Sequence, residues 1–405
     1  MTSRRILLGA FGDPGHAFPM IALGRALVAR GHDVTLQTWR RWEQHVREEG
    51  MSFAAAPEYQ VFPQGPEPLD FYEAVVHATR DTVPLVRELA PEVVVADILT
   101  LAPALAAELD GRPAATLIPH VYPHGRPEHP IYSLGARMPR TAAGRELWRR
   151  AHPIVRSGLE RGRRELNETR ARLGLPALDR VHGGISSELA IVATYPQLEY
   201  PRRWPAGVHV VGPLMWEPPA AALEDGDLAR TYAAPDDRPL VLIAPSTAQD
   251  AEHRMLRAAL LGLAELPVRV LATYNRRLPP RPLPVPENVR VVDWIVYSRE
   301  MPEAAVVVCH AGHGTLARAL SCGCAVVACP AVGDMNENAA RVDWAGAGVR
   351  VPRRFVTPRT LRSAVERALC EPAIRARARE IAVWSDGHDS GAAAAQLVEE
   401  LAARR

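Results

Sequence analysis

Residues 304–349 constrain the fold of this chain more than any other stretch. They open with an uninterrupted apolar run, Ala304 to Cys309, whose length and β-branched content are typical of a strand buried on both faces. Glycines follow, and Leu316 and Leu320 then recur at helical spacing. A doubly buried strand that passes through glycines into a helix predicts an α/β fold with a parallel sheet.

The turn between this strand and this helix suits a phosphate group. The first N–H groups of a helix have no partner within it, and they bring the positive end of the helix dipole to one point. Gly312 and Gly314 would let the backbone approach an anion closely, and His310 and Thr315 can add side-chain donors. Because strand–glycine–helix turns are common, this pattern alone is a weak signal.

A second short strand, Ala325 to Cys329, ends at Pro330 and leads into a polar loop. Carboxylate and amide side chains stand in that loop: Asp334, Asn336, Glu337 and Asn338. Such groups can hold hydroxyls at the carboxyl edge of the same sheet. The stretch therefore predicts a phosphate beside a polyol.

Length and composition narrow the class of protein. At 405 residues the chain is too long for one ordinary core, which predicts two domains. A net charge of +2 gives no bias toward nucleic acid or membranes, and no apolar run approaches a membrane span or a signal peptide. The absence of lysine excludes a lysine Schiff base and a Walker-type loop. The 5 cysteines, an odd number without zinc spacing, favour buried, reduced thiols in a cytoplasmic protein and no metal site.

The first half begins with a predicted βαβ unit. Arg5 to Phe11 is predicted as a buried strand, residues 12–16 as the turn after it, Pro19 as the start of a helix, and residues 33–38 as the next strand. The glycines after the first strand do not follow the G-x-G-x-x-G dinucleotide fingerprint, which argues against a dinucleotide site.

His16 and Asp97 both follow predicted parallel strands and therefore lie at the same rim of the first sheet. An imidazole there can take a proton from a hydroxyl, while a carboxylate on its other ring nitrogen fixes the tautomer. A structural His16 and a helix-capping Asp97 would give the same pattern, so both interpretations stand at this point.

The domain boundaries follow from composition. Residues 213–238 are rich in proline, alanine and acids without periodicity, and they are predicted to link a domain at 1–212 to a domain at 239–375, with further helices over 376–405. Irregular loops in the first half, among them residues 52–69 and the stretch from Tyr122 to Met138, can wall a pocket for a small, largely apolar molecule. The candidate acceptor-binding residues are Phe18, Phe62, Tyr122 and His124.

The order of the motifs adds a resemblance that covers nearly the whole chain. The matching segments are Gly15-His16, Pro19, Arg30-Gly31-His32-Asp33-Val34-Thr35, the His-x-Gly-x-Gly-Thr run from His310, and the Asp-x-x-x-Asn-Ala run from Asp334. This order resembles the family 1 inverting glycosyltransferases, which have the GT-B fold and glycosylate natural products. The resemblance implies two Rossmann-like, doubly wound domains with parallel sheets facing across a cleft, and C-terminal helices that pack back on the first domain.

The resemblance also implies roles for individual residues. His16 matches the catalytic base and Asp97 its orienting carboxylate. The implied donor-binding residues are Ser246 and Thr247 near the diphosphate, Trp294 stacking on the base, Ile295 bonding it through the backbone, His310 on the α-phosphate, Gly312, Gly314 and Thr315 in the diphosphate loop, and Asp334 and Met335 at the sugar.

Some positions depart from the family pattern and leave the donor open. Met335 replaces a common glutamine, which could suit a deoxysugar, and Arg318 stands where plant relatives use glutamate. Ala311 replaces a common glycine, and Val296-Tyr297 replaces Pro-Gln.

These inferences predict an inverting, metal-independent enzyme without a cofactor, which moves a sugar from a UDP- or dTDP-sugar to a hydroxyl of a small acceptor such as a natural product. Its expected partners are these two small molecules. Two alternatives are a nucleotide-sugar epimerase or hydrolase on the same fold, and a non-catalytic nucleotide-binding helper of a partner glycosyltransferase. The sequence does not indicate an oligomeric state.

Overall fold

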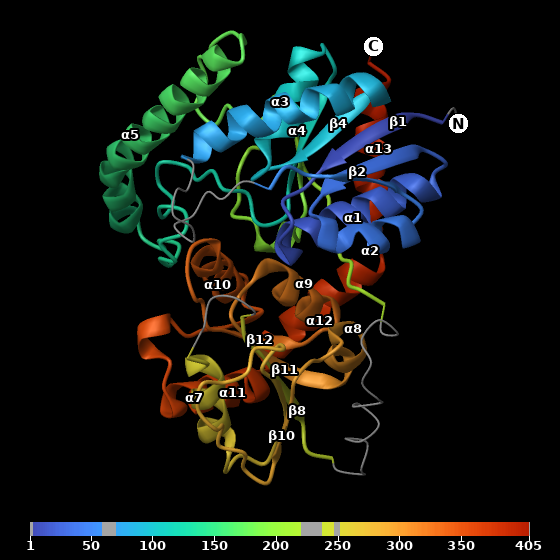
Figure 1. The fold of residues 1–405 in the computed structure, drawn as a ribbon. Helices are drawn as coiled ribbons and strands as arrows, with labels where there is room; N and C mark the ends of the chain where they lie inside the picture. Colours follow the sequence, from blue (N-terminus) through green and yellow to red (C-terminus); the bar gives the residue numbers. More distant parts are fainter. Residues whose placement is uncertain (1–2, 59–69, 220–236, 247–251, 405) are drawn as a thin grey trace.

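The computed structural model describes residues 3–58, 70–219, 237–246 and 252–404. Two parallel sheets form separate halves, with the N-terminal half above the C-terminal half in Figure 1. The predicted α/β fold with two parallel sheets is confirmed.

The N-terminal sheet has the strand order β3-β2-β1-β4-β5-β6-β7, and its described strand pairs are parallel. Its strands are β1 (Arg5–Gly9), β2 (Asp33–Thr38), β3 (Ser52–Ala55), β4 (Val93–Asp97), β5 (Ala114–Ile118), β6 (Ala190–Val192) and β7 (Val208–Val210). Alternate residues of β1 enter different clusters, since Ile6 and Leu8 pack on one face and Leu7 on the other. Apolar residues on both faces are what a strand covered by helices on two sides requires.

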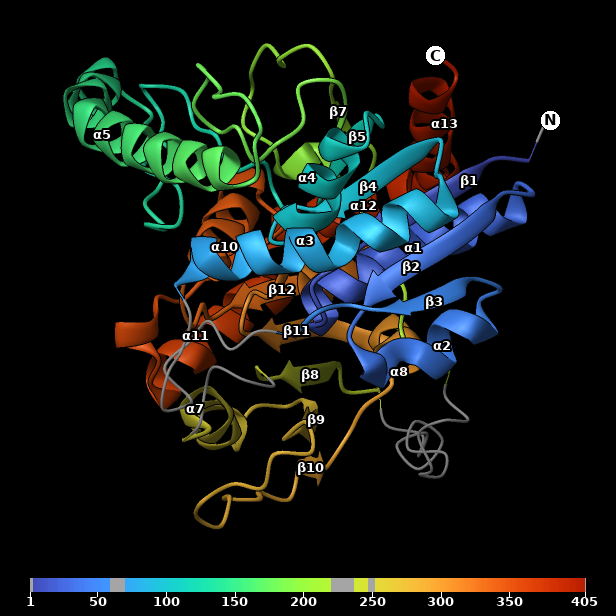
Figure 2. The ribbon, with the colours of Figure 1, turned by 45° about the horizontal axis from the view of Figure 1, so that its top comes forward.

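Helices cover both faces of this sheet, and Figure 2 shows α3 running across one of them. The helices of this half are α1 (Pro14–Ala29), α2 (Glu43–Glu48), α3 (Phe71–Leu89), α4 (Leu101–Leu109) and the long α5 (Ala142–Arg172), with short 3-10 turns η1 (Arg40–Trp42) and η2 (Pro196–Leu198).

Two local predictions in this half are wrong. Helix α1 begins at Pro14, which occupies a first-turn position where its missing N–H costs nothing, and Pro19 lies inside the helix. His16 is therefore in the first helical turn and not in a preceding loop. Residues 52–55, predicted as loop, form the edge strand β3, which pairs with β2.

The C-terminal sheet has the strand order β10-β9-β8-β11-β12-β13, and its described strand pairs are also parallel. Its strands are β8 (Leu240–Ala244), β9 (Arg269–Thr273), β10 (Val289–Val292), β11 (Ala304–Cys309), β12 (Ala325–Ala328) and β13 (Gly348–Arg350). Its helices are α7 (Arg254–Leu263), α8 (Tyr297–Glu300), α9 (His313–Ser321), α10 (Asp334–Ala345), α11 (Pro358–Cys370), α12 (Pro372–Asp386) and α13 (Ser390–Ala402), with 3-10 turns η4 (Met301–Glu303) and η5 (Arg353–Phe355).

The last two helices divide between the halves. Helix α12 packs on α9, whereas α13 packs on α1 and places Ala394 and Val398 in the N-terminal core. Both chain ends consequently lie at the same end of the molecule (Figure 1). At the start of the predicted linker, Leu214 and Trp216 are also buried in that core; residues 220–236 lie outside the described residues.

The two halves share part of their interior. One hydrophobic cluster combines Val121, Tyr195 and Leu198 of the N-terminal half with the face of the C-terminal sheet that α9 covers. The Tyr195 hydroxyl donates to the Ala317 carbonyl over 3.0 Å. This contact and the shared cluster join the halves from within.

The thiols mostly follow the prediction. Cys309, Cys324 and Cys329 are buried, and Cys322 is partly so. Cys370 is exposed because it ends α11, which contradicts the prediction for that residue. Among the described helices, none combines the length and the apolarity that a membrane crossing requires.

Candidate functional site

The candidate site lies where the strand order of each sheet reverses. The reversal falls between β1 and β4 in the first sheet and between β8 and β11 in the second. Ligands of open α/β sheets bind beyond the carboxyl ends of the strands at such points. His16 and Asp97 stand at the first reversal, and Ser246 and His310 stand at the second.

His16 and Asp97 form a hydrogen-bonded pair. The distance from His16 Nδ1 to Asp97 Oδ1 is 2.8 Å. Asp97 is 1% exposed, and its second oxygen accepts the backbone N–H of Leu99 at 3.3 Å. Because a carboxylate can only accept, the ring proton lies on Nδ1, and Nε2 keeps its lone pair for a proton from another molecule.

Opposing influences act on the pKa of His16. Burial lowers the pKa, but the charge and hydrogen bond of Asp97 and the charges of Asp334 and Asp13 outweigh burial, so that the pKa is raised above 6.5. Asp334 belongs to the C-terminal half, so a carboxylate of the other half also acts on this imidazole.

We predict that Asp97→Asn moves the acid limb of the kcat/KM profile to lower pH and lowers the maximal rate. A base works only when unprotonated, so a raised pKa puts the wild-type limb above pH 6.5, and loss of the Asp97 charge brings the limb down. The measurement is kcat/KM at pH values between about 5 and 9, spaced by about half a pH unit. Asp33→Asn, at an exposed carboxylate that begins β2, is the control; an unmoved limb in Asp97→Asn would contradict the assignment.

The second rim is built around the start of α9. Gly312 is its N-cap residue, and among the described residues no side-chain hydrogen bond caps the helix, so its first N–H groups are left for a ligand. His310 Nδ1 donates to the Ala244 carbonyl over 3.3 Å, which directs the other ring nitrogen over Gly312. A methyl group at Gly312 would overlap that ring, whereas one at Gly314 would meet no described atom beyond its own helix and its neighbours within 4 Å.

Ala311 has a φ of 61°, in the left-handed region that favours glycine. Its carbonyl accepts the side-chain N–H of Asn338 at 3.1 Å, and its methyl group is fully buried. The alanine at this position therefore keeps the conformation that a glycine would adopt, held in place by packing and by Asn338.

Asp334 is the first residue of α10 and not part of a loop, which corrects the prediction. Asp334 and Glu337 occupy the first turn of the helix, where negative charge favours the helix dipole. Asn338 also donates to Asp334 over 3.4 Å, so one buried amide links the carboxylate to the Ala311 turn.

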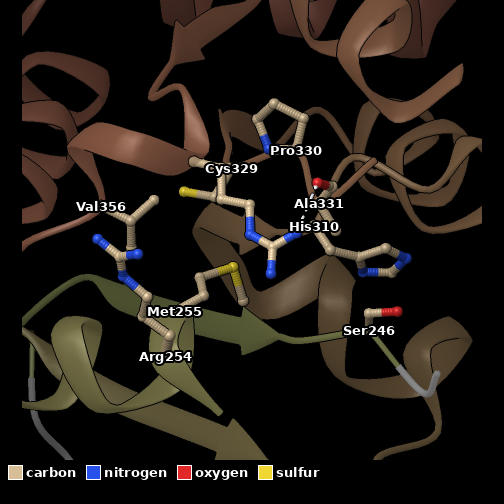
Figure 3. A pocket seen from close by; sticks show the side chains of 9 residues that line it. Ser246, Arg254, Met255, His310, Cys329, Pro330, Ala331 and Val356 are labelled. Atoms are coloured by element: carbon tan, nitrogen blue, oxygen red, sulfur yellow. Dashed lines mark hydrogen bonds between the residues drawn. The ribbon is translucent and has the colours of Figure 1, made fainter. Parts of the chain in front are cut away.

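A pocket runs from the end of β8 to the start of α7. Its lining residues are Ser246, Arg254, Met255, His310, Cys329, Pro330, Ala331, Arg353 and Val356. Figure 3 shows His310 and Ser246 on one side of it and Arg254 and Val356 on the other. Two arginines, a histidine and a helix start give this pocket the charge of an anion site.

Comparison with known proteins agrees with this geometry. Residues 257–401 match the family model described as the erythromycin biosynthesis protein CIII-like, C-terminal domain. The 4'-demethylrebeccamycin synthase of Lentzea aerocolonigenes is 28% identical over 98% of this chain and 99% of its own length. The O-mycaminosyltylonolide 6-deoxyallosyltransferase of Streptomyces fradiae is 29% identical over 99% and 98%. The chain is a glycosyltransferase.

Solved structures show the same fold over the whole length. The glycotransferase of kitacinnamycin superposes with a TM-score of 0.75 at 22% identity, covering 98% of this chain and 99% of that one. The calicheamicin glycosyltransferase CalG4 gives 0.73 at 23% identity, covering 100% and 99%.

The glycosyltransferase places Trp294 just after β10, with the guanidinium of Arg276 over its ring at 5.1 Å from the centroid. Its buried Nε1 has no partner among the described residues. Ile295 is 2% exposed, which leaves only its backbone for ligand contact. Thr315 lies partly exposed in the first turn of α9, and Met335 lies in the first turn of α10, packed against the shared cluster. Thr247 lies outside the described residues.

Two of the other residues that depart from the family pattern, Arg318 and Tyr297, contact polar side chains of the protein. The Arg318 guanidinium lies 3.3 Å from a Glu217 oxygen, and the Tyr297 hydroxyl donates to the Asn275 side-chain oxygen over 3.4 Å. Both side chains are therefore committed within the protein.

The candidate acceptor residues that the structure describes make packing contacts within the first half. Tyr122 is 3% exposed and packs in a core cluster, because the chain turns inward after β5. Phe18 packs edge-to-face on Trp42 and Trp216 at the N-terminal core. His124 stacks on His182. These side chains act in packing in this structure, and Phe62 lies outside the described residues.

The sequence predictions missed further residues that lie near His16 or line the pocket beside His310. His120 follows β5, the strand beside β4, and the Tyr132 hydroxyl lies 3.3 Å from its Nδ1. Burial lowers the pKa of His120, with a further lowering by His16, while Asp334 and Asp97 act in the other direction. Burial and the charge of His120 lower the pKa of His313 to about 3. The strand-end position of His120 was a usable signal; no spacing pointed to Arg254 or Arg353.

Among the described residues, no cluster of three or more histidine, cysteine or acidic side chains could hold a metal ion.

Proposed function

We propose that this glycosyltransferase carries out an inverting, metal-independent transfer of a sugar from a dTDP- or UDP-sugar to a hydroxyl of a small, largely apolar natural product. The carrying observation is the pair formed by His16 and Asp97, whose charge environment includes Asp334 of the opposite half. A base on one wall and a carboxylate beside a phosphate cradle on the other fit a direct displacement between two bound substrates.

The chemical step balances with the groups present. His16 Nε2 takes the proton of the acceptor hydroxyl as its oxygen forms a bond to the anomeric carbon. The bond from that carbon to the diphosphate oxygen breaks, and its electron pair leaves with the diphosphate. The imidazolium formed on His16 is stabilised by the Asp97 carboxylate. A single displacement of this kind inverts the anomeric centre.

The leaving diphosphate is stabilised by protein charge in place of a metal ion. The start of α9, His310, Arg254 and Arg353 surround or border the proposed phosphate position. Since His310 Nδ1 already donates to Ala244, its Nε2 must carry a second proton to donate to a phosphate. A nearby phosphate favours that protonated form.

Relatives support the choice of donor and acceptor classes. One relative is named a 6-deoxyallosyltransferase. The glycosyltransferase VinC, whose structure was solved in complex with dTDP, has a similar fold, with a TM-score of 0.71 and 19% identity over 99% of this chain and 100% of that one. Met335 beside Asp334 would suit a sugar with an apolar carbon in place of a hydroxyl. The buried free thiols are compatible with a reducing, cytoplasmic setting.

A thermal-shift panel of UDP, dTDP and GDP tests the donor. We expect UDP or dTDP to raise the melting temperature and GDP to leave it unchanged, because the family resemblance implies that Trp294 stacks on uracil or thymine. Saturation at 100 times Kd contributes about 2.7 kcal/mol of stability. The sugar form of the preferred nucleotide is then incubated with a panel of hydroxylated natural products, and the products are separated by chromatography.

The outcomes of that incubation distinguish the proposed transfer reaction from the alternative functions. Glycosylated acceptor with the opposite anomeric configuration supports the proposal. Complete conversion of the donor without acceptor would favour an epimerase or hydrolase, and nucleotide binding without turnover would favour a helper protein. Preferential stabilisation by GDP would contradict the donor assignment.

A further inference from the structure

We propose that Arg341 is a positioning residue that locks α10 to the N-terminal half and thereby fixes the donor sugar relative to the base. This proposal rests on the proposed function, since it concerns the alignment of the two substrates. Arg341 has no match to a motif noted in the sequence, and it does not touch the reacting atoms.

Arg341 is 1% exposed, yet every nitrogen of its guanidinium has a partner. Its Nη1 donates to a Glu199 oxygen over 2.6 Å and to the Leu198 carbonyl over 3.2 Å, and its Nη2 donates to the Tyr122 carbonyl over 3.4 Å. Its Nε donates to Glu337 over 2.8 Å. Three of these contacts cross from α10 to the N-terminal half, so Arg341 ties the two halves together.

The same helix carries the groups of the donor site. Asp334, Asn338 and Arg341 follow one another at helical spacing and therefore share a face of α10. Asn338 donates to Asp334 and to the carbonyl of Ala311 in the phosphate turn. Asn338 thus joins the sugar carboxylate and the phosphate turn to α10, so a shift at Arg341 would move the donor site as one unit relative to the base and leave the site itself intact.

On the other side, the partners of Arg341 connect to the rim that holds the base. Glu199 accepts the backbone N–H of Tyr122 over 2.6 Å with its other oxygen. Tyr122 lies just beyond His120, at the end of β5, and β5 pairs directly with β4, which ends at Asp97. The path from the sugar carboxylate to the orienting carboxylate therefore consists of one helix, one ion pair and two neighbouring strands.

The charges in this cluster call for arginine. One guanidinium faces two carboxylates that are each 4% exposed, and the ring of Tyr200 lies 4.0 Å from the guanidinium carbon. A planar fork can reach both carboxylates, both carbonyls and the ring at once, whereas a lysine ammonium cannot. A purely stabilising ion pair would not need to span the two halves, and buried ion pairs are weak contributors to stability.

Arg341→Lys is the decisive variant, with Arg170→Lys as its matched control. Arg170 is equally buried, with 3% of its side chain exposed, and forms two 2.7 Å bonds to Glu108, but all its partners lie within the N-terminal half. We expect Arg341→Lys to lower kcat about 10²-fold through misalignment, while the Kd for dTDP or UDP stays unchanged. Arg170→Lys should lower the melting temperature less, because Glu108 is 43% exposed, and should keep the wild-type kcat.

The pH profile provides a readout that a structural role alone would not move. The charged groups that act on His16 are Asp97 and Asp13 of its own half, Asp334 across the gap, and His120 beside it. If Asp334 withdraws, the pKa of His16 falls, so the acid limb of kcat/KM in Arg341→Lys should lie at lower pH than in wild type and in Arg170→Lys. An unchanged kcat and limb in Arg341→Lys would overturn the proposal, as would an equal loss of kcat in both variants.

Failure of the proposed function can be told apart from failure of this inference. A wild-type protein that transfers no sugar would refute the function, and hydrogen exchange then still decides the role of Arg341. Arg341→Lys should exchange faster than wild type over residues 120–124 and 334–341, while Arg170→Lys should change only its own surroundings. Equal exchange at both segments in wild type and Arg341→Lys would refute the lock.

Discussion

His16→Ala is expected to lower kcat for sugar transfer by about 10²–10⁴-fold, the usual contribution of a well-placed general base. The physical reason is the 2.8 Å bond to Asp97, which leaves Nε2 as the proton acceptor at the gap. Alanine removes the acceptor, and water has to take the proton instead. The measurement is the initial rate with saturating donor and acceptor.

Binding of nucleotide should survive the same substitution, because the diphosphate cradle belongs to the C-terminal half. His209→Ala, at an exposed position of β7, is the control for the removal of an imidazole. Turnover within about threefold of wild type in His16→Ala would show that another group takes the proton and would shift attention to His120.

A methyl group at Gly312 or Gly314 is expected to weaken donor binding by different routes. At Gly312 the methyl overlaps the His310 ring and displaces it, and at Gly314 it enters open space at the start of α9 that the phosphate would fill. Each hydrogen bond lost from a charged group costs about 1.5–3 kcal/mol, so a loss of about 10–150-fold in affinity is expected for either variant. Kd for the preferred nucleotide, measured by calorimetry, checks both.

The glycine variants also distinguish an effect on the stability of the fold from an effect on nucleotide binding. Gly314→Ala should melt at or above the wild-type temperature, since alanine favours a helix and its methyl group meets no described atom outside its own helix turn within 4 Å. Gly158→Ala in α5, where an added methyl group also meets nothing within 4 Å, controls for helix stabilisation far from the site. A wild-type Kd in Gly314→Ala would place the phosphate elsewhere.

The fold was predictable because its signals are local and strong. The apolar runs that became β1, β4, β8 and β11 are doubly buried strands, and such strands occur almost only in parallel sheets covered by helices. Strand ends then bring His16 and Asp97 to one rim without any knowledge of packing, and the structure places them in contact. The glycines after β11 likewise indicated a helix start.

What the sequence could not give depends on contacts between distant segments. Asp334 was placed in a loop because its acidic neighbours were interpreted as ligand groups, although acids in a first turn also favour a helix. Tyr122 is aromatic in an irregular segment, which suggested a pocket wall, but its backbone bond to Glu199 holds it inward. Arg254, Arg353 and Arg341 have no spacing signal in a chain whose basic residues are all arginine.

The hydrophobic cluster around Tyr195, which the two halves share, has a practical consequence for the design of fragments of this enzyme. Val121 and Leu198 lie against residues beneath α9, and α13 completes the opposite core after the polypeptide has crossed over a second time. A fragment starting near residue 239 would expose the apolar residues of the shared cluster to solvent. It would also carry α13 without the N-terminal core on which that helix packs. Sugar-nucleotide recognition in isolation is therefore better studied with point variants in the intact polypeptide than with a truncated piece.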